Sequence, residues 1–233
     1  MSSRSLTSRA LAGVAALLLA AGCERTESAP AAVFVLLDVS KTFYEHKAAS
    51  LESAEEIVKG LDPGDRFAFA RVGTCSFGRE NVLLDVDLPG REDLAAQAKL
   101  TLINDVGRLT YRLRSADHTD IIGAFWEVRR QREGLAHAPV VIVLFSDLVA
   151  DVRGSGCAEG RDELPDLAGA RVILADVGEA AEDRADPRAF FTRVDDWTER
   201  LMAAGAADVT YVAGGAARTR AAVEAALASG RPT

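Results

Sequence analysis

Cysteine and histidine are scarce in this sequence, and their scarcity excludes several kinds of site. The 233 residues include three Cys and three His. Three Cys are too few to hold together a disulfide-stapled scaffold, and no Cys-x-x-Cys pair indicates a zinc site. His46, His118 and His137 do not have the spacing of metal ligands. The chain therefore lacks the sequence signals of a zinc protein and of a disulfide scaffold.

Clusters of basic residues are also missing. The formal net charge is −8, and no cluster of Lys or Arg overrides it. Because phosphate binding requires a basic surface, this charge argues against a nucleic-acid partner. Apolar residues make up 48% of the chain, as in ordinary globular proteins. The length suits one domain with a sizeable core.

The sequence has no apolar run that would span a bilayer comfortably. Its most apolar stretch, Ala10 to Ala21, follows the basic residues Arg4 and Arg9 and leads into Gly22-Cys23. A positive start and an apolar run of this length are typical of a secretory signal peptide. We predict that residues 1–22 are that signal peptide.

The segment Leu19-Ala20-Ala21-Gly22-Cys23 resembles a bacterial lipobox. The resemblance implies cleavage before Cys23, lipid on its thiol, and a lipoprotein anchored at the periplasmic face of the bacterial cell envelope. Glu24, rather than Asp, follows the Cys and is compatible with the outer membrane. The alternative is an ordinary secretory signal with a chance Cys. Residues 23–32, which include Pro30 and show no periodicity, are predicted to be a tether.

After the tether, strand-like and helix-like segments alternate. Continuous apolar runs such as Val33 to Leu37 and Val140 to Phe145 are typical of strands buried on both faces. Apolar residues at helical spacing indicate helices between them. The predicted strands are residues 33–37, 66–72, 81–86, 140–145, 171–175 and 209–212. The predicted helices are residues 46–60, 93–113, 120–131, 190–203 and 216–228.

This alternation predicts a three-layer, Rossmann-like α/β domain over residues 33–228, followed by a tail at 229–233. The central sheet is expected to be mostly parallel, with helices on both faces. The strands at 66–72 and 81–86 are separated by about eight residues that contain Gly73 and Gly78. Such a short connection allows an antiparallel pair and therefore one antiparallel edge strand.

Polar residues follow the predicted buried strands. In a sheet of this kind, ligands bind beyond the carboxyl ends of the strands. Asp38-Val39-Ser40-Lys41-Thr42 follows the first strand, and Ser146-Asp147 follows the strand at 140–145. His118-Thr119-Asp120 comes at the start of the helix at 120–131. The fold could bring all three segments together at one edge.

These residues resemble the metal-ion-dependent adhesion site (MIDAS) of the von Willebrand factor type A (VWA) family. That site uses Asp-x-Ser-x-Ser after the first strand, a Thr in a later loop and an Asp after the central strand. The matching residues here are Asp38, Ser40, Thr42, Thr119 and Asp147, with a Thr in place of the second Ser. The resemblance extends from Ala31 to about Ala228. It implies a VWA fold and a protein-binding module, for adhesion or as a scaffold, rather than an enzyme.

The resemblance also implies the ligand chemistry of the site. Mg²⁺ is a hard cation that prefers oxygen ligands and keeps several waters, and Mn²⁺ is the second candidate. In the family, the hydroxyl groups bind the metal directly and the Asp residues hold it partly through water. With few direct anionic ligands, the metal stays electrophilic. An open position can then take the carboxylate of an acidic residue on a protein partner.

Three other interpretations remain open, one of which is a metal-free scaffold that binds a partner through other loops. A metal-dependent hydrolase or phosphotransferase could use the same strand-end site, although the haloacid dehalogenase type needs a second Asp where Ser40 stands. Asp38 and Ser40 could instead only cap the following helix, which leaves the other two segments unexplained. Asp120 could support the metal or begin its helix, and His118 could line the site or lie in solvent.

Two cysteines remain once Cys23 carries lipid. Cys75 follows the strand at 66–72, and Cys157 lies in the long loop after Asp147. Both strands are expected to end at the same edge of the sheet, so the two loops can meet there. Because an exported protein folds in an oxidising compartment, we predict a Cys75–Cys157 disulfide. The alternative is two unrelated loop thiols.

Overall fold

The computed structural model describes residues 29–135, 138–152, 157 and 161–231. The predicted signal peptide, the lipidation site Cys23 and the first part of the tether lie outside the described residues. The first strand begins at Ala32 and the last helix ends at Gly230. Ala32 therefore belongs to the sheet rather than to the tether, and residues 229–230 belong to the last helix rather than to the tail.

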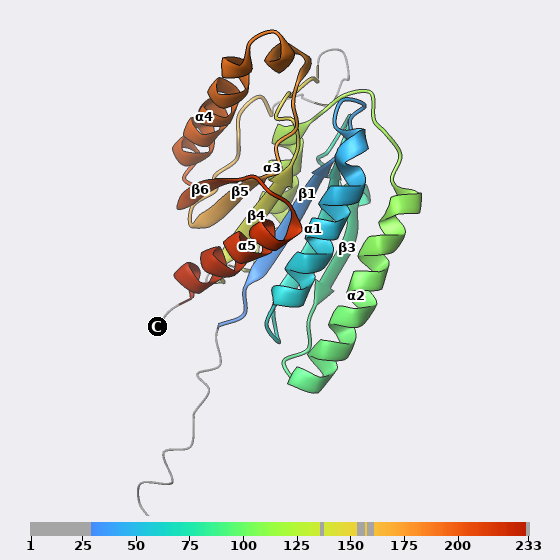
Figure 1. The fold of residues 1–233 in the computed structure, drawn as a ribbon. Helices are drawn as coiled ribbons and strands as arrows, with labels where there is room; N and C mark the ends of the chain where they lie inside the picture. The colour runs from blue at the N-terminus through green and yellow to red at the C-terminus, as the bar shows by residue number, and fades with distance from the viewer. Residues whose placement is uncertain (1–28, 136–137, 153–156, 158–160, 232–233) are drawn as a thin grey trace, which may run out of the picture.

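A six-stranded sheet forms the middle layer of the domain (Figure 1). Its strand order is β3-β2-β1-β4-β5-β6, and all neighbouring pairs are parallel except β2 with β3. The mostly parallel sheet with one antiparallel edge strand is therefore confirmed. The strands are β1 (Ala32–Asp38), β2 (Arg66–Val72), β3 (Val82–Asp87), β4 (Val140–Phe145), β5 (Ala170–Ala175) and β6 (Asp208–Val212).

Helices cover both faces of this sheet, as predicted. One face is covered by α1 (Lys47–Gly60), α2 (Glu92–Arg112) and α5 (Ala216–Gly230). The other is covered by α3 (Ile121–Gln131) and α4 (Pro187–Ala203). Short 3₁₀ helices occur at η1 (Tyr44–His46), η2 (Arg79–Asn81) and η3 (Ala181–Arg184). Within the described residues, no helix is long and apolar enough to cross a membrane.

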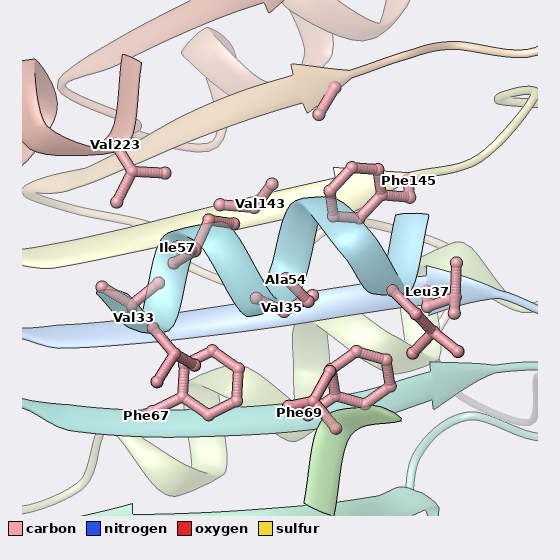
Figure 2. Packing of buried hydrophobic residues seen from close by; sticks show 14 of the residues in the cluster. Val33, Val35, Leu37, Ala54, Ile57, Phe67, Phe69, Val143, Phe145 and Val223 are labelled. Atoms are coloured by element: carbon pink, nitrogen blue, oxygen red, sulfur yellow. The ribbon is translucent and has the colours of Figure 1, made fainter. Parts of the chain in front are cut away.

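The central strand β1 supplies side chains to both cores. Successive side chains of a strand point to opposite faces. Val33, Val35 and Leu37 pack against α1 on one face (Figure 2). Phe34 and Leu36 belong to the core under α3 and α4. Because every residue of β1 is buried, the strand reads in the sequence as a continuous apolar run that ends at one carboxylate.

The register of the parallel strands places their carboxyl ends at one edge of the sheet. Leu37 pairs with Phe145 of β4, and Asp38 pairs with Val72 of β2. The loops that follow β1, β2 and β4 therefore leave the sheet side by side. This edge carries the candidate site.

Candidate metal centre

The loop after β1 brings one carboxylate and two hydroxyl groups together. Asp38 ends the strand and is fully buried. Its Oδ1 accepts a 2.7 Å hydrogen bond from the backbone N–H of Ser40, which folds the chain back over the strand end. Ser40 Oγ and Thr42 Oγ1 then lie 3.2 Å apart. Ser40 is buried and Thr42 is exposed, so this cluster reaches from the sheet edge to solvent.

The loop after β4 joins this cluster through Ser146. Its hydroxyl group donates a 2.6 Å hydrogen bond to Asp38 Oδ2 and accepts one of 3.0 Å from Leu148 N–H. Asp147 is 1% exposed, and its Oδ1 accepts a 3.0 Å hydrogen bond from Val149 N–H. Because β1 and β4 are neighbours, Asp38 at the end of β1 and Asp147 just after β4 lie at the same edge of the sheet.

The segment before α3 contacts both of these loops. Ala116 accepts a 3.2 Å hydrogen bond from Lys41 N–H and donates one of 2.8 Å to the Val39 carbonyl oxygen. Thr119 is buried, and its backbone forms a two-way bridge with Asp151 at 2.9 and 3.0 Å. Backbone contacts thus hold the Thr119 segment between the other two. The structure brings together all three segments that carry the predicted ligands.

Two buried carboxylates give the edge an unusual electrostatic character. The pKa of Asp38 is raised from 3.8 to about 6. Burial is the main cause, the hydrogen bonds from Ser146 and Ser40 oppose it, and the charge of Asp147 adds the smallest contribution. Among the described residues, no Lys, Arg or His forms a direct ion pair with the carboxylate of Asp38 or Asp147, although the charge of Arg193 acts on Asp147 from a distance. A buried ionised carboxylate is costly unless a positive charge compensates it. A cation at this edge would provide that compensation.

The donor types at this edge fit a hard cation. The predicted ligands Asp38, Ser40, Thr42, Thr119 and Asp147 offer only oxygen atoms, three of them as hydroxyl groups. The described part of the chain contains no cluster of three or more His, Cys, Asp or Glu that could hold a metal. This edge therefore does not provide a metal site made of carboxylates and imidazoles alone. Oxygen donors with few carboxylates suit Mg²⁺ or Mn²⁺.

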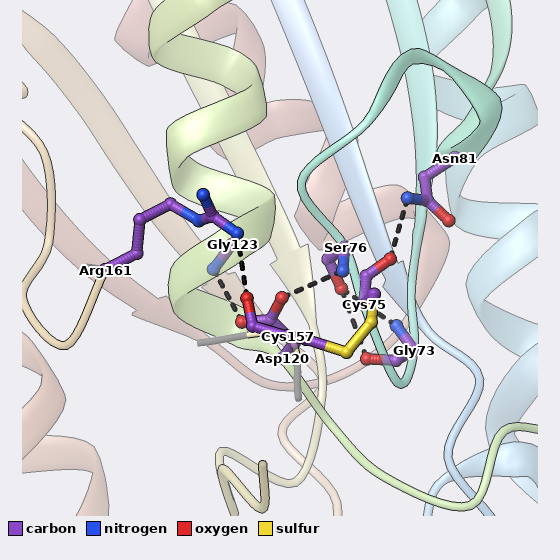
Figure 3. Close-up of a disulfide and its surroundings, with 8 residues drawn as sticks. All are labelled: Gly73, Cys75, Ser76, Asn81, Asp120, Gly123, Cys157 and Arg161. Carbon is purple, nitrogen blue, oxygen red and sulfur yellow. Dashed lines mark hydrogen bonds between the residues drawn. A yellow bond between two sulfur atoms is a disulfide. The ribbon is translucent and has the colours of Figure 1, made fainter. Parts of the chain in front are cut away.

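Asp120 is the N-cap residue of α3. This favours the interpretation that it begins the helix over the interpretation that it supports the metal. Its Oδ1 accepts a 2.8 Å hydrogen bond from Gly123 N–H, as an N-cap residue does. Its Oδ2 accepts one of 2.8 Å from Ser76 N–H (Figure 3). Both oxygens are thus committed to backbone donors. The neighbouring His118 is partly exposed, with Nδ1 3.2 Å from Asp151 Oδ2.

A disulfide links the loops after β2 and β4 beside Asp120 (Figure 3). It joins Cys75 to Cys157 with the two Cα atoms 5.2 Å apart, within the range that a disulfide allows. Asn81 Nδ2 donates a 2.8 Å hydrogen bond to the Cys75 carbonyl oxygen and so steadies the same loop. This is the pairing that the sequence predicts.

Comparison with known proteins identifies the fold. No protein-family profile and no curated protein sequence matches this chain. A manganese-loaded TRAP protein from Plasmodium vivax aligns over 85% of this chain and 73% of its own, at 11% identity and a TM-score of 0.54. BatB from Bacteroides thetaiotaomicron aligns over 86% of this chain and 98% of its own, at 12% identity and a TM-score of 0.53. Both are VWA-domain proteins.

The domain has the VWA fold. Within the described residues, the sheet order, the antiparallel edge strand and the five long helices are those of that fold. A third similar structure is the pilus adhesin SpaC from Lactobacillus rhamnosus GG, which aligns over 87% of this chain and 30% of its own, at 8% identity and a TM-score of 0.52.

Two residues of this VWA domain form hydrogen bonds to predicted ligands but were not themselves among the predicted site residues. Ser146 connects the two strand-end loops through Asp38. Arg193, in α4, donates a 2.7 Å hydrogen bond from Nε to the carbonyl oxygen of Asp147. The Ser146-Asp147 pair was visible in the sequence as a polar strand end. Nothing in the sequence pairs Arg193 with Asp147, because the contact depends on how α4 packs.

Proposed function

We propose that this VWA domain is a metal-dependent binding module that recognises a protein partner in the bacterial cell envelope. The observation that carries the proposal is the cluster of Ser40 and Thr42 hydroxyl groups, 3.2 Å apart, beside the buried carboxylate of Asp38. Helix capping alone does not explain this cluster, because α1 begins only at Lys47, and neither of the two hydroxyl groups caps it. The proposed ligands are Asp38, Ser40, Thr42, Thr119 and Asp147.

The proposed cation is Mg²⁺, with Mn²⁺ as the alternative. The hydroxyl groups of Ser40, Thr42 and Thr119 would bind it directly, and Asp38 and Asp147 would hold it partly through water. Support comes from the oxygen-only donor set and from the manganese-loaded TRAP protein, which has the same fold. The bound metal would supply an electrophilic position for an incoming carboxylate.

The proposed partner is a protein that presents an Asp or Glu to this position. Thr42 is exposed, so the cluster is accessible from solvent. Beside it, Lys41 and Asp117 form an exposed ion pair at 2.6 Å, which a partner could contact. We favour binding over catalysis. The residue two places after Asp38 is Ser40 and not the second Asp of a phosphotransferase, and His118 pairs with Asp151.

The proposed lipid anchor would attach to the domain at the end opposite the metal site. The tether from Cys23 leads to the amino end of β1, and the metal site lies at the carboxyl end of the same strand. Seven residues of strand separate the two ends by about 20 Å. A periplasmic partner could therefore reach the site without approaching the bilayer.

Calorimetric titration with Mn²⁺ tests the metal site. Asp147→Ala should abolish binding without unfolding the domain, because a strand-end carboxylate contributes little to the core. Ser40→Ala should weaken binding less, because water can replace one hydroxyl group. Asp176→Asn is the matched control. Asp176 follows the neighbouring strand β5 at the same edge but accepts hydrogen bonds from Gly214 and Gly215 at 3.0 Å. That variant should bind Mn²⁺ like the wild type.

Partner capture from envelope extract tests the second half of the proposal. The wild-type protein should retain its partner in Mg²⁺ and release it in excess chelator, and Asp147→Ala should behave like the chelated wild type. A partner that binds equally well in chelator would contradict the metal-bridged mechanism and leave the fold unaffected.

A further inference from the structure

Two side chains of α4 hold the backbone that follows β4. Arg193 Nε donates a 2.7 Å hydrogen bond to the Asp147 carbonyl oxygen. Trp197 Nε1 donates one of 2.8 Å to the carbonyl oxygen of Leu148. The two residues are four positions apart, so they lie on the same face of the helix. They bind two successive carbonyl groups, one belonging to a proposed metal ligand and the next to its neighbour.

The backbone at this point needs support. Leu148 has a φ of 61°, in the left-handed region that branched residues rarely adopt. Its N–H donates to Ser146 Oγ at 3.0 Å, and its carbonyl oxygen accepts from Trp197. The strained residue is therefore held on both sides. The turn that it makes allows the Asp147 carboxylate to accept the N–H of Val149.

Arg193 is itself held in place by Asp183. Its Nη1 and Nη2 donate hydrogen bonds of 2.9 and 2.6 Å to the two carboxylate oxygens of Asp183. Asp183 Oδ2 also accepts a 2.7 Å hydrogen bond from Ala180 N–H. The side chains are 15% and 4% exposed, so solvent screens this pair little. The planar guanidinium group thus forms a rigid connection between Asp183 and the Asp147 backbone.

We infer that Arg193, held by Asp183 and assisted by Trp197, is a positioning residue that fixes the Asp147 carboxylate for the cation. The inference rests on the proposed metal site and assigns no ligand role to α4. Charge alone predicts the opposite effect of losing Arg193, because a guanidinium group near a cation repels it. Positioning predicts that metal binding weakens, and charge repulsion predicts that it tightens.

Mn²⁺ affinity of the full-length protein, measured by calorimetry, separates these effects. Arg193→Gln removes both the charge and the hydrogen bonds. Arg193→Lys keeps the charge but cannot reproduce the planar fork. If geometry matters, both variants should bind Mn²⁺ about 10- to 100-fold more weakly, the range typical of residues that orient metal ligands. Equal losses in the two variants would attribute the effect to position rather than to charge.

Arg66→Gln is the matched control for a purely structural role. Arg66 also forms a two-bonded pair with a carboxylate, that of Asp85 at 2.8 and 3.0 Å, and its Nη1 reaches the carbonyl oxygen of Gln131. It starts β2, at the opposite end of the sheet from the metal site. Arg66→Gln should lower the metal-free melting temperature but leave Mn²⁺ affinity within about twofold of wild type.

A second pair of variants decides the question if the Arg193 variants do not fold. Trp197→Phe keeps an aromatic side chain but removes the N–H donor. Trp126→Phe, on α3, likewise removes the N–H that donates a 3.0 Å hydrogen bond to the Glu163 carbonyl oxygen. Only Trp197→Phe should weaken Mn²⁺ binding. Wild-type or tighter Mn²⁺ binding in the Arg193 variants would overturn the inference. If the Arg193 variants do not fold, the same result in Trp197→Phe would overturn it. Equal losses of affinity in the control variants would also overturn it. A wild-type protein that binds no Mn²⁺ would overturn the proposed site first.

Discussion

Ser146 Oγ donates a 2.6 Å hydrogen bond to Asp38 Oδ2, so a hydroxyl group at the end of β4 compensates a buried carboxylate at the end of β1. Ser146 Oγ also accepts a hydrogen bond from the N–H of Leu148. Through these two bonds, the strand ends that carry Asp38 and Asp147 form one unit rather than two independent loops. The predictions below depend on this unit and on the edge to which it belongs.

Ser146→Ala should destabilise the protein by about 1–3 kcal/mol, because it leaves the buried Asp38 carboxylate and the Leu148 N–H without this partner. Urea unfolding measures the change. Ser53→Ala is the control, since Ser53 is also fully buried but its hydroxyl group has no hydrogen-bond partner among the described residues. Removing that hydroxyl group should be neutral or stabilising. Equal losses in the two variants would contradict the role given to Ser146.

In the metal-free protein, Asp38 should make a contribution to stability that is lost as the pH rises from about 4 to about 6. Its pKa rises from 3.8 to about 6 on folding, so the folded state keeps a proton that the unfolded chain releases. The contribution of Asp38 therefore falls as pH rises through this window and levels off above about 6. The loss is on the order of 3 kcal/mol.

Asp38→Asn should remove this part of the pH dependence. Urea unfolding in chelator at several pH values would show the difference between wild type and variant. With Mn²⁺ present, the wild type should regain stability at neutral pH, and the variant should gain less. Parallel pH profiles for the two proteins in chelator would show that Asp38 does not carry the burial penalty.

The Cys75–Cys157 disulfide should be present in the exported protein. It closes a loop between residues 82 positions apart, and a disulfide of this kind stabilises a protein by about 2–4 kcal/mol. The double variant Cys75→Ser/Cys157→Ser should lose that amount, and reduced wild type should match it. Mass spectrometry of the unreduced periplasmic protein after alkylation is the check. Two alkylated thiols would rule the disulfide out.

Cys23→Ala should release the protein from the membrane fraction, because the predicted lipid is attached to that thiol. Cell fractionation with immunoblotting measures the distribution. Glu24→Ala, next to the lipidation site, is the control and should leave the protein in the membrane fraction. A wild-type protein that is already free in the periplasm would refute the anchor.

Much of the fold could be predicted from the sequence because the central strands are buried on both faces. The predicted strands at 66–72 and 140–145 coincide with β2 and β4. The start of α4 was predicted three residues late, at Phe190 instead of Pro187. Asp186 accepts a hydrogen bond from Arg188 N–H, and Pro187 takes the first helical position. The Asp186-Pro187 pair in the sequence indicates a helix start, but a prediction from the spacing of apolar residues alone does not use it.

The candidate site was less predictable than the fold. The hydroxyl groups and carboxylates after β1 and β4 could be found, because a parallel sheet gathers its strand ends. The hydrogen bond from Ser146 to Asp38 depends on the register between β1 and β4, which the sequence does not state. The bond from Arg193 to Asp147 joins residues 46 positions apart through the packing of a helix. Such contacts follow from tertiary structure alone.

The most direct test of the central claim is anomalous scattering from crystals of the protein grown with Mn²⁺. We expect one strong peak at the carboxyl edge of β1 and β4, with the hydroxyl oxygens of Ser40, Thr42 and Thr119 about 2.1 Å from the metal. Asp38 and Asp147 should lie next to the metal or its bound waters. Absence of a peak there at saturating Mn²⁺, or a peak that remains there in Asp147→Ala, would contradict the account.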